Sequence, residues 1–216
     1  MALTGFVPFD TANIKWLTSA SKIPQFPDPS ITYMIWDGIN PDNAVPWGKG
    51  KSVVMYDSFG LSDGSGHIAQ ISGSTSGIFA VPGGLKIPAY MLRNNSKVLV
   101  QVEATKVGAN GTASLSVTLG TLNSASDGVM SSISVPSATG SQMFASCAAR
   151  FGVSTTKFNT RNSLGEGVTQ ASSSTTMYDR INNIDTTQDM WVNINISSAS
   201  SADVFNLIGV QVKLEY

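Results

Sequence analysis

The sequence is poor in the residues that build most metal sites and catalytic triads. It contains one cysteine, Cys147, and one histidine, His67. One cysteine excludes an intrachain disulfide and a zinc site built on several thiolates, and one histidine excludes a centre with several imidazole ligands. No Gly-x-Ser-x-Gly motif accompanies His67, so a Ser-His-Asp triad is not expected. Cys147 lies among alanines and serines and is interpreted as a small buried hydrophobic residue.

Charged residues are also scarce. They make up 12% of the chain, and the formal net charge is −1. Without a basic field the chain is not expected to bind nucleic acid. No apolar run approaches the roughly 20 residues that a membrane helix needs, and the N-terminus lacks the pattern of a signal peptide. We therefore expect a protein that is made in a cytoplasm and does not enter a membrane.

Residues 48–52, Gly-Lys-Gly-Lys-Ser, resemble the end of a phosphate-binding loop. That motif requires a glycine five positions before Gly50, where Val45 stands, and neither a strand nor a helix pattern flanks the segment. It is interpreted as a flexible joint. The acidic residues are scattered and match no calcium-binding loop. We expect no cofactor, no metal and no catalytic residue in this chain.

Proline and aromatic residues are concentrated in residues 1–50, which hold six of the nine prolines. Proline prevents a long helix and removes donors from a central strand, whereas aromatic side chains argue against a solvated disordered tail. The segment is predicted to be an extended arm that either caps the domain's own core or reaches across a neighbouring subunit, where aromatic residues anchor interfaces. The candidate interface residues are Phe6, Phe9, Trp16, Phe26, Tyr33, Trp36 and Trp47.

The C-terminal residues alternate apolar and polar side chains, first from Met190 to Ile196 and then from Val204 to Tyr216. A period of two predicts two half-buried antiparallel strands. In the second strand the alternation assigns Val204, Ile208 and Val210 to the buried face. The residues between the strands, 198–203, fit either a hairpin or a passage from one sheet to another.

A second pair of alternating segments, residues 98–104 and 113–119, flanks an Asn-Gly sequence at residues 110–111. Because Asn-Gly supplies the positive φ angles of a tight turn, the pair is predicted to form a hairpin. Residues 141–152 fit a short helix or a strand equally well. Further strands are expected at residues 31–36, 52–59, 67–71, 77–81, 85–92, 129–135, 156–160 and 175–181.

About ten short strands without a long helix pattern or a repeat predict an all-β, antiparallel β-sandwich. The sequence lacks the Cys…Trp…Cys pattern of immunoglobulin domains, and its strand lengths and long loops favour a jelly roll. The expected organisation is an extended arm, residues 1–50, followed by a jelly-roll domain, residues 51–216.

An arm rich in proline and aromatic residues, followed by a Ser/Thr/Gly-rich jelly roll that ends in a strand from Phe205 to Tyr216, resembles small virion structural proteins of tailed bacteriophages. The resemblance implies a non-enzymatic capsid decoration protein, head fibre or tail component. It implies binding to capsid or tail proteins, self-association as a homo-oligomer, commonly a trimer, and a location in the virion after assembly in the host cytoplasm.

Two other functions fit the same sequence. A carbohydrate-binding or receptor-binding module would hold a surface glycan against exposed aromatic residues such as Trp47, Trp191 or Tyr178. A glycan-cleaving enzyme would need two carboxylates that face each other across a cleft, and the sequence does not place such a pair.

Overall fold

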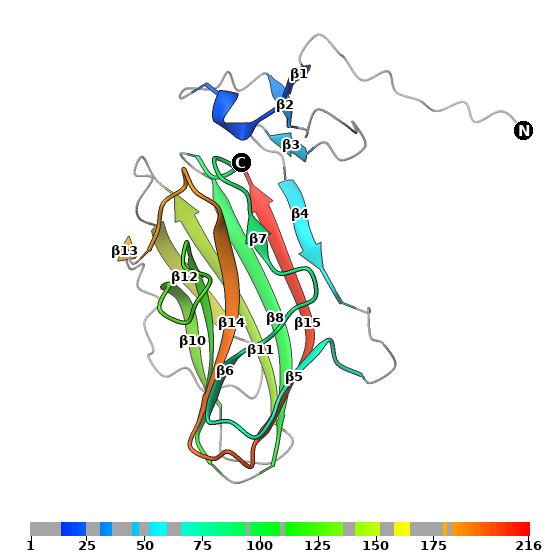
Figure 1. Cartoon of the computed structure of the whole chain (residues 1–216), viewed down its shortest axis with the longest axis vertical. Helices are drawn as coiled ribbons and strands as arrows, with labels where there is room; N and C mark the ends of the chain where they lie inside the picture. Colours follow the sequence, from blue (N-terminus) through cyan, green and yellow to red (C-terminus); the bar gives the residue numbers. More distant parts are fainter. Residues whose placement is uncertain are drawn as a thin grey trace, which may run out of the picture.

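The computed structural model describes residues 14–24, 31–35, 45–47, 52–59, 66–93, 96–108, 111–135, 141–151, 158–164, 179–180 and 183–216. The described chain is all-β, as predicted: apart from the 3-10 turn η2 (Ala20–Lys22), its regular elements are strands. They form two large sheets and one small sheet (Figure 1). In these residues no helix has the length and apolar character to span a membrane.

The larger sheet has seven strands, and every described pairing in it is antiparallel. Its order is β13 (Asp179–Arg180), β12 (Phe158–Leu164), β11 (Ser141–Phe151), β8 (Lys97–Val107), β15 (Val204–Glu215) and β4 (Ser52–Asp57), with β5 (Ala69–Ile71) also paired with β15. Residues 141–151 are thus a strand rather than a helix. The predicted strand at residues 156–160 begins two residues later and continues to Leu164.

The second sheet has five strands, also antiparallel. Its order is β10 (Gly128–Val135), β9 (Ala113–Gly120), β14 (Met190–Ser198) and β6 (Ser76–Ile78), with β7 (Lys86–Ile87) paired with β14. This sheet lies in front of the seven-stranded sheet in the view of Figure 1. Two antiparallel sheets that face each other are consistent with the predicted β-sandwich.

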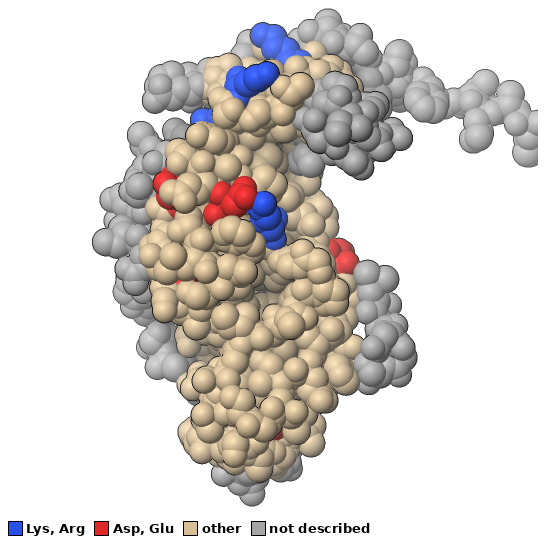
Figure 2. Space-filling model, in the orientation of Figure 1, with Lys and Arg blue, Asp and Glu red and all other residues tan. Residues whose placement is uncertain are grey.

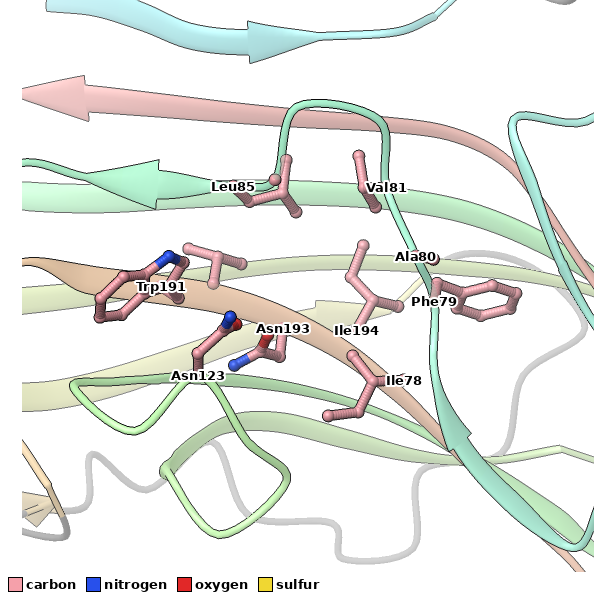
Figure 3. Close-up of a pocket in the computed structure, with 11 residues that line it drawn as sticks. Ile78, Phe79, Ala80, Val81, Leu85, Asn123, Trp191, Asn193 and Ile194 are labelled. Carbon is pink, nitrogen blue, oxygen red and sulfur yellow. The ribbon is translucent and has the colours of Figure 1, made fainter.

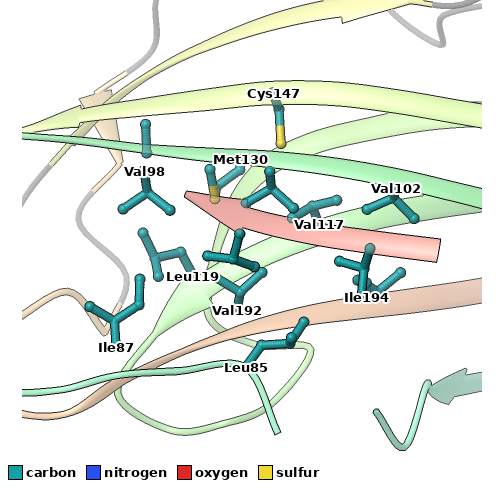
Figure 4. Close-up of a cluster of buried hydrophobic side chains, with 14 of the residues drawn as sticks. Leu85, Ile87, Val98, Val102, Val117, Leu119, Met130, Cys147, Val192 and Ile194 are labelled. Carbon is teal, nitrogen blue, oxygen red and sulfur yellow. The ribbon is translucent and has the colours of Figure 1, made fainter. Parts of the chain in front are cut away.

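The inward side chains of the two sheets form one apolar core (Figure 4). On β8 each second residue from Val98 to Ala104 is buried, and on β9 each second residue from Ala113 to Leu119 is buried. Cys147 of β11 is 3% exposed in this core, which confirms its interpretation as a small buried hydrophobic residue. Burial raises the pKa of its thiol to about 12, so the thiol stays neutral at physiological pH.

The predicted hairpin of residues 98–104 and 113–119 is wrong. Both segments are strands, but β8 pairs with β11 and β15, whereas β9 pairs with β10 and β14. The alternation is the same in both cases, because each strand turns its apolar side chains toward the shared core from an opposite sheet. The segment from β14 to β15, residues 198–203, also passes between the sheets, which decides between the two alternatives left by the sequence.

The predicted facing of the last strand is correct from Val210 onward and wrong before it. Phe205 and Leu207 are buried, while Val204 and Ile208 are only half-buried. The cause is a β-bulge: Leu207 pairs with Ala104 and Gly209 with Glu103, so that Ile208 has no partner in the register. One extra residue in a strand exchanges its two faces.

The described parts of residues 1–50 form the small sheet, β1 (Ile14–Leu17), β2 (Thr32–Ile35) and β3 (Val45–Trp47), in which β1 and β2 are parallel. Figure 1 places this sheet at the end of the sandwich where β15 finishes. The ring centroids of Trp47 and Tyr216 are 5.1 Å apart, and the Trp47 indole N–H donates to the Met91 carbonyl at 3.1 Å. The extended arm and its boundary at residue 50 stay predictions.

Candidate functional site

The candidate site is a pocket on the outer face of the five-stranded sheet. Strands β6 and β7 pair with the same edge of β14, at residues 195–197 and 190–191. Residues 79–85 form the loop that connects β6 to β7. Its two ends are held to β14 by hydrogen bonds from Phe79 N–H to Ile194 O (3.0 Å) and from Val192 N–H to Leu85 O (2.9 Å). Gly83 and Gly84 have φ angles of 78° and 69°, which glycine adopts without strain.

The resulting pocket has a volume of about 320 Å³. Figure 3 shows its walls: Val81 and Leu85 of the loop of residues 79–85 lie on one side, and Asn123 lies on the other. Trp191 and Asn193 come from β14 between them. The lining therefore combines an indole ring, aliphatic side chains and two carboxamides.

The indole of Trp191 is half-buried, and an ion pair between Lys86 and Asp189 lies beside it. The Lys86 ammonium lies 5.9 Å from the centre of the ring and 2.5 Å from Asp189 Oδ2. Asp189 Oδ1 also accepts the backbone N–H of Ala89 at 2.9 Å. The hydrogen bonds from Lys86 and Ala89 lower the pKa of Asp189, so this carboxylate is ionised at neutral pH and balances the charge of Lys86.

Asn193 and Asn123 are positioned by a buried carboxylate, Asp127, which is 2% exposed. Asp127 accepts the backbone N–H groups of Leu122 (3.1 Å) and Ser124 (3.0 Å) and the Asn193 side-chain amide (3.4 Å). These bonds fold the loop of residues 121–127, which carries Asn123, onto the outer face of β14. A Cβ atom at Gly120 would overlap the Asp127 carboxylate, so a residue without a side chain is needed there.

The face around the pocket carries few charges. Figure 2 shows this side of the molecule, which is largely uncharged over the body of the sandwich. Outside the pocket the sheet presents hydroxyl groups in register, because Ser116 pairs with Ser132 and Ser114 pairs with both Ser134 and Ser197. A surface of this kind offers hydrogen bonds without an electrostatic field.

The structure divides the predicted interface residues into three groups. Tyr33 and Trp47 are 2% and 4% exposed: Tyr33 packs against Trp47, and Trp47 packs against Tyr216. Packing on the chain's own core is one of the two roles that the sequence allows for the arm. Trp16 is 53% exposed. Phe6, Phe9, Phe26 and Trp36 lie outside the described residues.

The three aromatic residues suggested to hold a glycan also differ in their surroundings. Trp47 is buried and offers no platform, Trp191 lines the pocket, and Tyr178 lies outside the described residues. His67 is half-buried just before β5, and the described residues contain no group of His, Cys, Asp and Glu that could hold a metal ion. Asp185 forms a local turn: hydrogen bonds from the Thr187 hydroxyl and backbone lower its pKa.

The sequence did not predict a buried polar cluster formed by Lys106, Asp203 and Ser198. Lys106 and Asp203 are fully buried, and their Nζ and Oδ1 atoms are 3.3 Å apart. The Ser198 hydroxyl hydrogen-bonds to the other Asp203 oxygen. The available signal was the position of Lys106, which continues the inward-facing series of Val98 to Ala104.

Comparison of the chain with protein-family models and with curated protein sequences gives no match in either case.

Proposed function

We propose that this chain is a non-enzymatic structural protein of a bacteriophage particle. In this proposal a jelly-roll sandwich binds capsid or tail subunits through its N-terminal arm and self-associates as a homo-oligomer, with a trimer favoured. One observation carries it: the small N-terminal sheet is fixed to the sandwich, and its Trp16 is 53% exposed. Exposed tryptophan on a fixed support is the kind of residue that anchors protein interfaces.

The N-terminal segment is held to the body of the protein at two places. The Trp47 ring packs against Tyr216, as described above. The Arg93 guanidinium donates through Nη2 to the carbonyl oxygens of Ala20 (2.8 Å) and Ile23 (3.4 Å). Fixing the segment before it meets a partner lowers the conformational entropy that is lost on binding.

The edge of the sandwich supports self-association. Strand β4 pairs with β15 and with no other strand among those described, and its Val54 side chain is 53% exposed. An edge strand with an exposed apolar residue can pair with a strand of another chain. The edge at β4 is therefore the proposed contact between copies.

The experiment is made on particles produced from the genome that encodes this chain. Mass spectrometry of purified particles should find the chain in a fixed ratio to the major capsid or tail protein. Particles that lack the chain should then bind the recombinant full-length protein, and Trp16→Ala should weaken this binding at least about tenfold. Val107→Ala, which truncates another exposed apolar residue, is the matched control and should bind like the wild type.

The outcomes separate the parts of the proposal. Absence of the chain from purified particles contradicts a virion role. Normal binding by Trp16→Ala contradicts attachment through the N-terminal segment. Light scattering of the purified protein tests the oligomer, and a monomer at all concentrations contradicts self-association.

A further inference from the structure

We infer that the pocket beside Trp191 binds a single neutral sugar residue, either free or at the end of a glycan. This inference goes beyond the structural role and does not depend on it. It commits to the pocket formed by residues 78–85, Asn123 and β14, and to an uncharged pyranose as the ligand.

The chemistry of the lining suits a sugar ring. One face of a pyranose carries C–H groups that pack on an aromatic ring, and its edge carries hydroxyl groups that need hydrogen-bond partners. Trp191 supplies the ring, and the amides of Asn123 and Asn193 supply donors and acceptors. A volume of about 320 Å³ lies at the lower end of the range for small-molecule pockets, which fits one sugar residue rather than an extended ligand.

The charge balance favours a neutral ligand. The Lys86 ammonium beside Trp191 is paired with Asp189, and Asp127 accepts hydrogen bonds from Leu122 and Ser124 of its own loop and from Asn193. A carboxylate or phosphate on the ligand would compete with Asp189 for the Lys86 ammonium and would be repelled by the Asp189 carboxylate. A sugar without charge meets neither competition nor repulsion.

The two amides are placed before a ligand arrives. Asn123 sits in the left-handed region (φ 53°) within the loop that Asp127 holds, so its position is set by the backbone. Asn193 donates one of its two side-chain N–H groups to Asp127, and this hydrogen bond fixes the orientation of its amide. Groups that are already oriented lose little entropy on binding.

The test uses the full chain and saturation-transfer NMR with methyl glycosides of glucose, galactose, mannose and N-acetylglucosamine at millimolar concentration. Sialic acid, glucuronic acid and glucose 6-phosphate are the charged probes. We expect at least one neutral glycoside to bind and to shift the Trp191 indole N–H signal, and the charged probes to bind more weakly. Oligosaccharides that end in the same sugar distinguish a glycan from a free sugar as the source.

Variants then locate the site. Trp191→Ala should weaken binding at least about tenfold and Asn123→Ala several-fold, while Trp16→Ala should leave it unchanged. Asn123 is exposed on its loop, so its substitution reports on the pocket even if Trp191→Ala does not fold. The inference is overturned if no neutral glycoside binds, if a charged probe binds more tightly, or if Asn123→Ala and a folded Trp191→Ala both bind like the wild type. None of these results bears on the presence of the chain in particles.

Discussion

The indole ring of Trp47 packs against the phenol ring of Tyr216, with centroids 5.1 Å apart and planes inclined by 49°. Tyr33 completes the group, with its ring centroid 5.9 Å from that of Trp47. Desolvation raises the pKa of the Tyr216 phenol, which is therefore neutral at any ordinary pH. The contact joins β3 in the N-terminal segment to the last residue of the chain, so the segment is part of the sandwich's own core at this point.

The first prediction concerns this contact. Trp47→Ala removes a buried ring and its hydrogen bond to Met91, and should lower the free energy of unfolding by roughly 3–5 kcal/mol. Urea denaturation followed by circular dichroism measures the loss. Trp16→Ala removes an exposed indole and should change the free energy by less than about 0.5 kcal/mol. Equal shifts in the two variants would show that Trp47 is not a core residue.

Periodicity predicted the strands but could not predict what interrupts them. A strand with an inward and an outward face reads as alternation, and this located the buried residues of β8, β9 and β14 correctly. The bulge at Ile208 depends on the pairing of β15 with β8, which lies in the tertiary structure. The one sequence feature that accompanies the bulge is Gly209 beside it, since glycine inside a strand often marks a bulge. A Cβ atom at this position would overlap the Phe59 ring.

The second prediction tests the bulge. Val210→Asp places a charge in the core beside Val102 of β8, because Val210 is fully buried, and should prevent folding or soluble expression. Ile208→Asp should remain folded, since the bulge turns Ile208 to the half-exposed face. Simple alternation assigns both residues to the same face and would make both variants unfold. Soluble yield and circular dichroism distinguish the two results.

The sequence also could not predict which strands belong to the same sheet. Gly108 to Gly111 looks like a hairpin turn in the sequence, yet the strands on its two sides, β8 and β9, belong to different sheets. A Cβ atom on Gly108 would come within 2.5 Å of the Ala202 carbonyl oxygen. The chain at the end of β8 thus lies against the segment between β14 and β15. The ion pair of Lys106 and Asp203 connects them, and no local pattern links these two residues.

The third prediction concerns this ion pair. Lys106→Met leaves the buried Asp203 carboxylate without its cation and should cost roughly 3–5 kcal/mol of stability. Asp203→Leu should cost a similar amount, since it leaves a buried ammonium. The double variant removes both charges and should be more stable than either single variant. A double-mutant cycle from denaturation curves measures the coupling, and strictly additive losses would show that the pair is not coupled.

The sequence named only one residue of the pocket. Trp191 was proposed, with Trp47 and Tyr178, as an exposed aromatic residue that could hold a glycan. Asn123 and Asn193 reach the pocket through the fold of the loop of residues 121–127, which depends on three hydrogen bonds to Asp127. Such a loop gives no periodic signal, so its contribution to a site becomes visible only when strands β9 and β14 are placed side by side.

The fourth prediction uses the buried thiol of Cys147. Burial raises its pKa from 9.0 to about 12, so the folded protein keeps the thiol proton in a pH range where the unfolded chain loses it. Ionisation then favours the unfolded chain, and the stability contribution that is complete below pH 9 is lost as the pH rises toward 12, by at most about 1.4 kcal/mol per pH unit. Cys147→Ala lacks this proton, while its neighbours on the same face, Ala145 and Ala149, show that a methyl group fits the layer. Denaturation midpoints measured from below pH 9 to about pH 11 should therefore fall less steeply for Cys147→Ala than for the wild type, and parallel profiles would mean that the thiol ionises equally in both states.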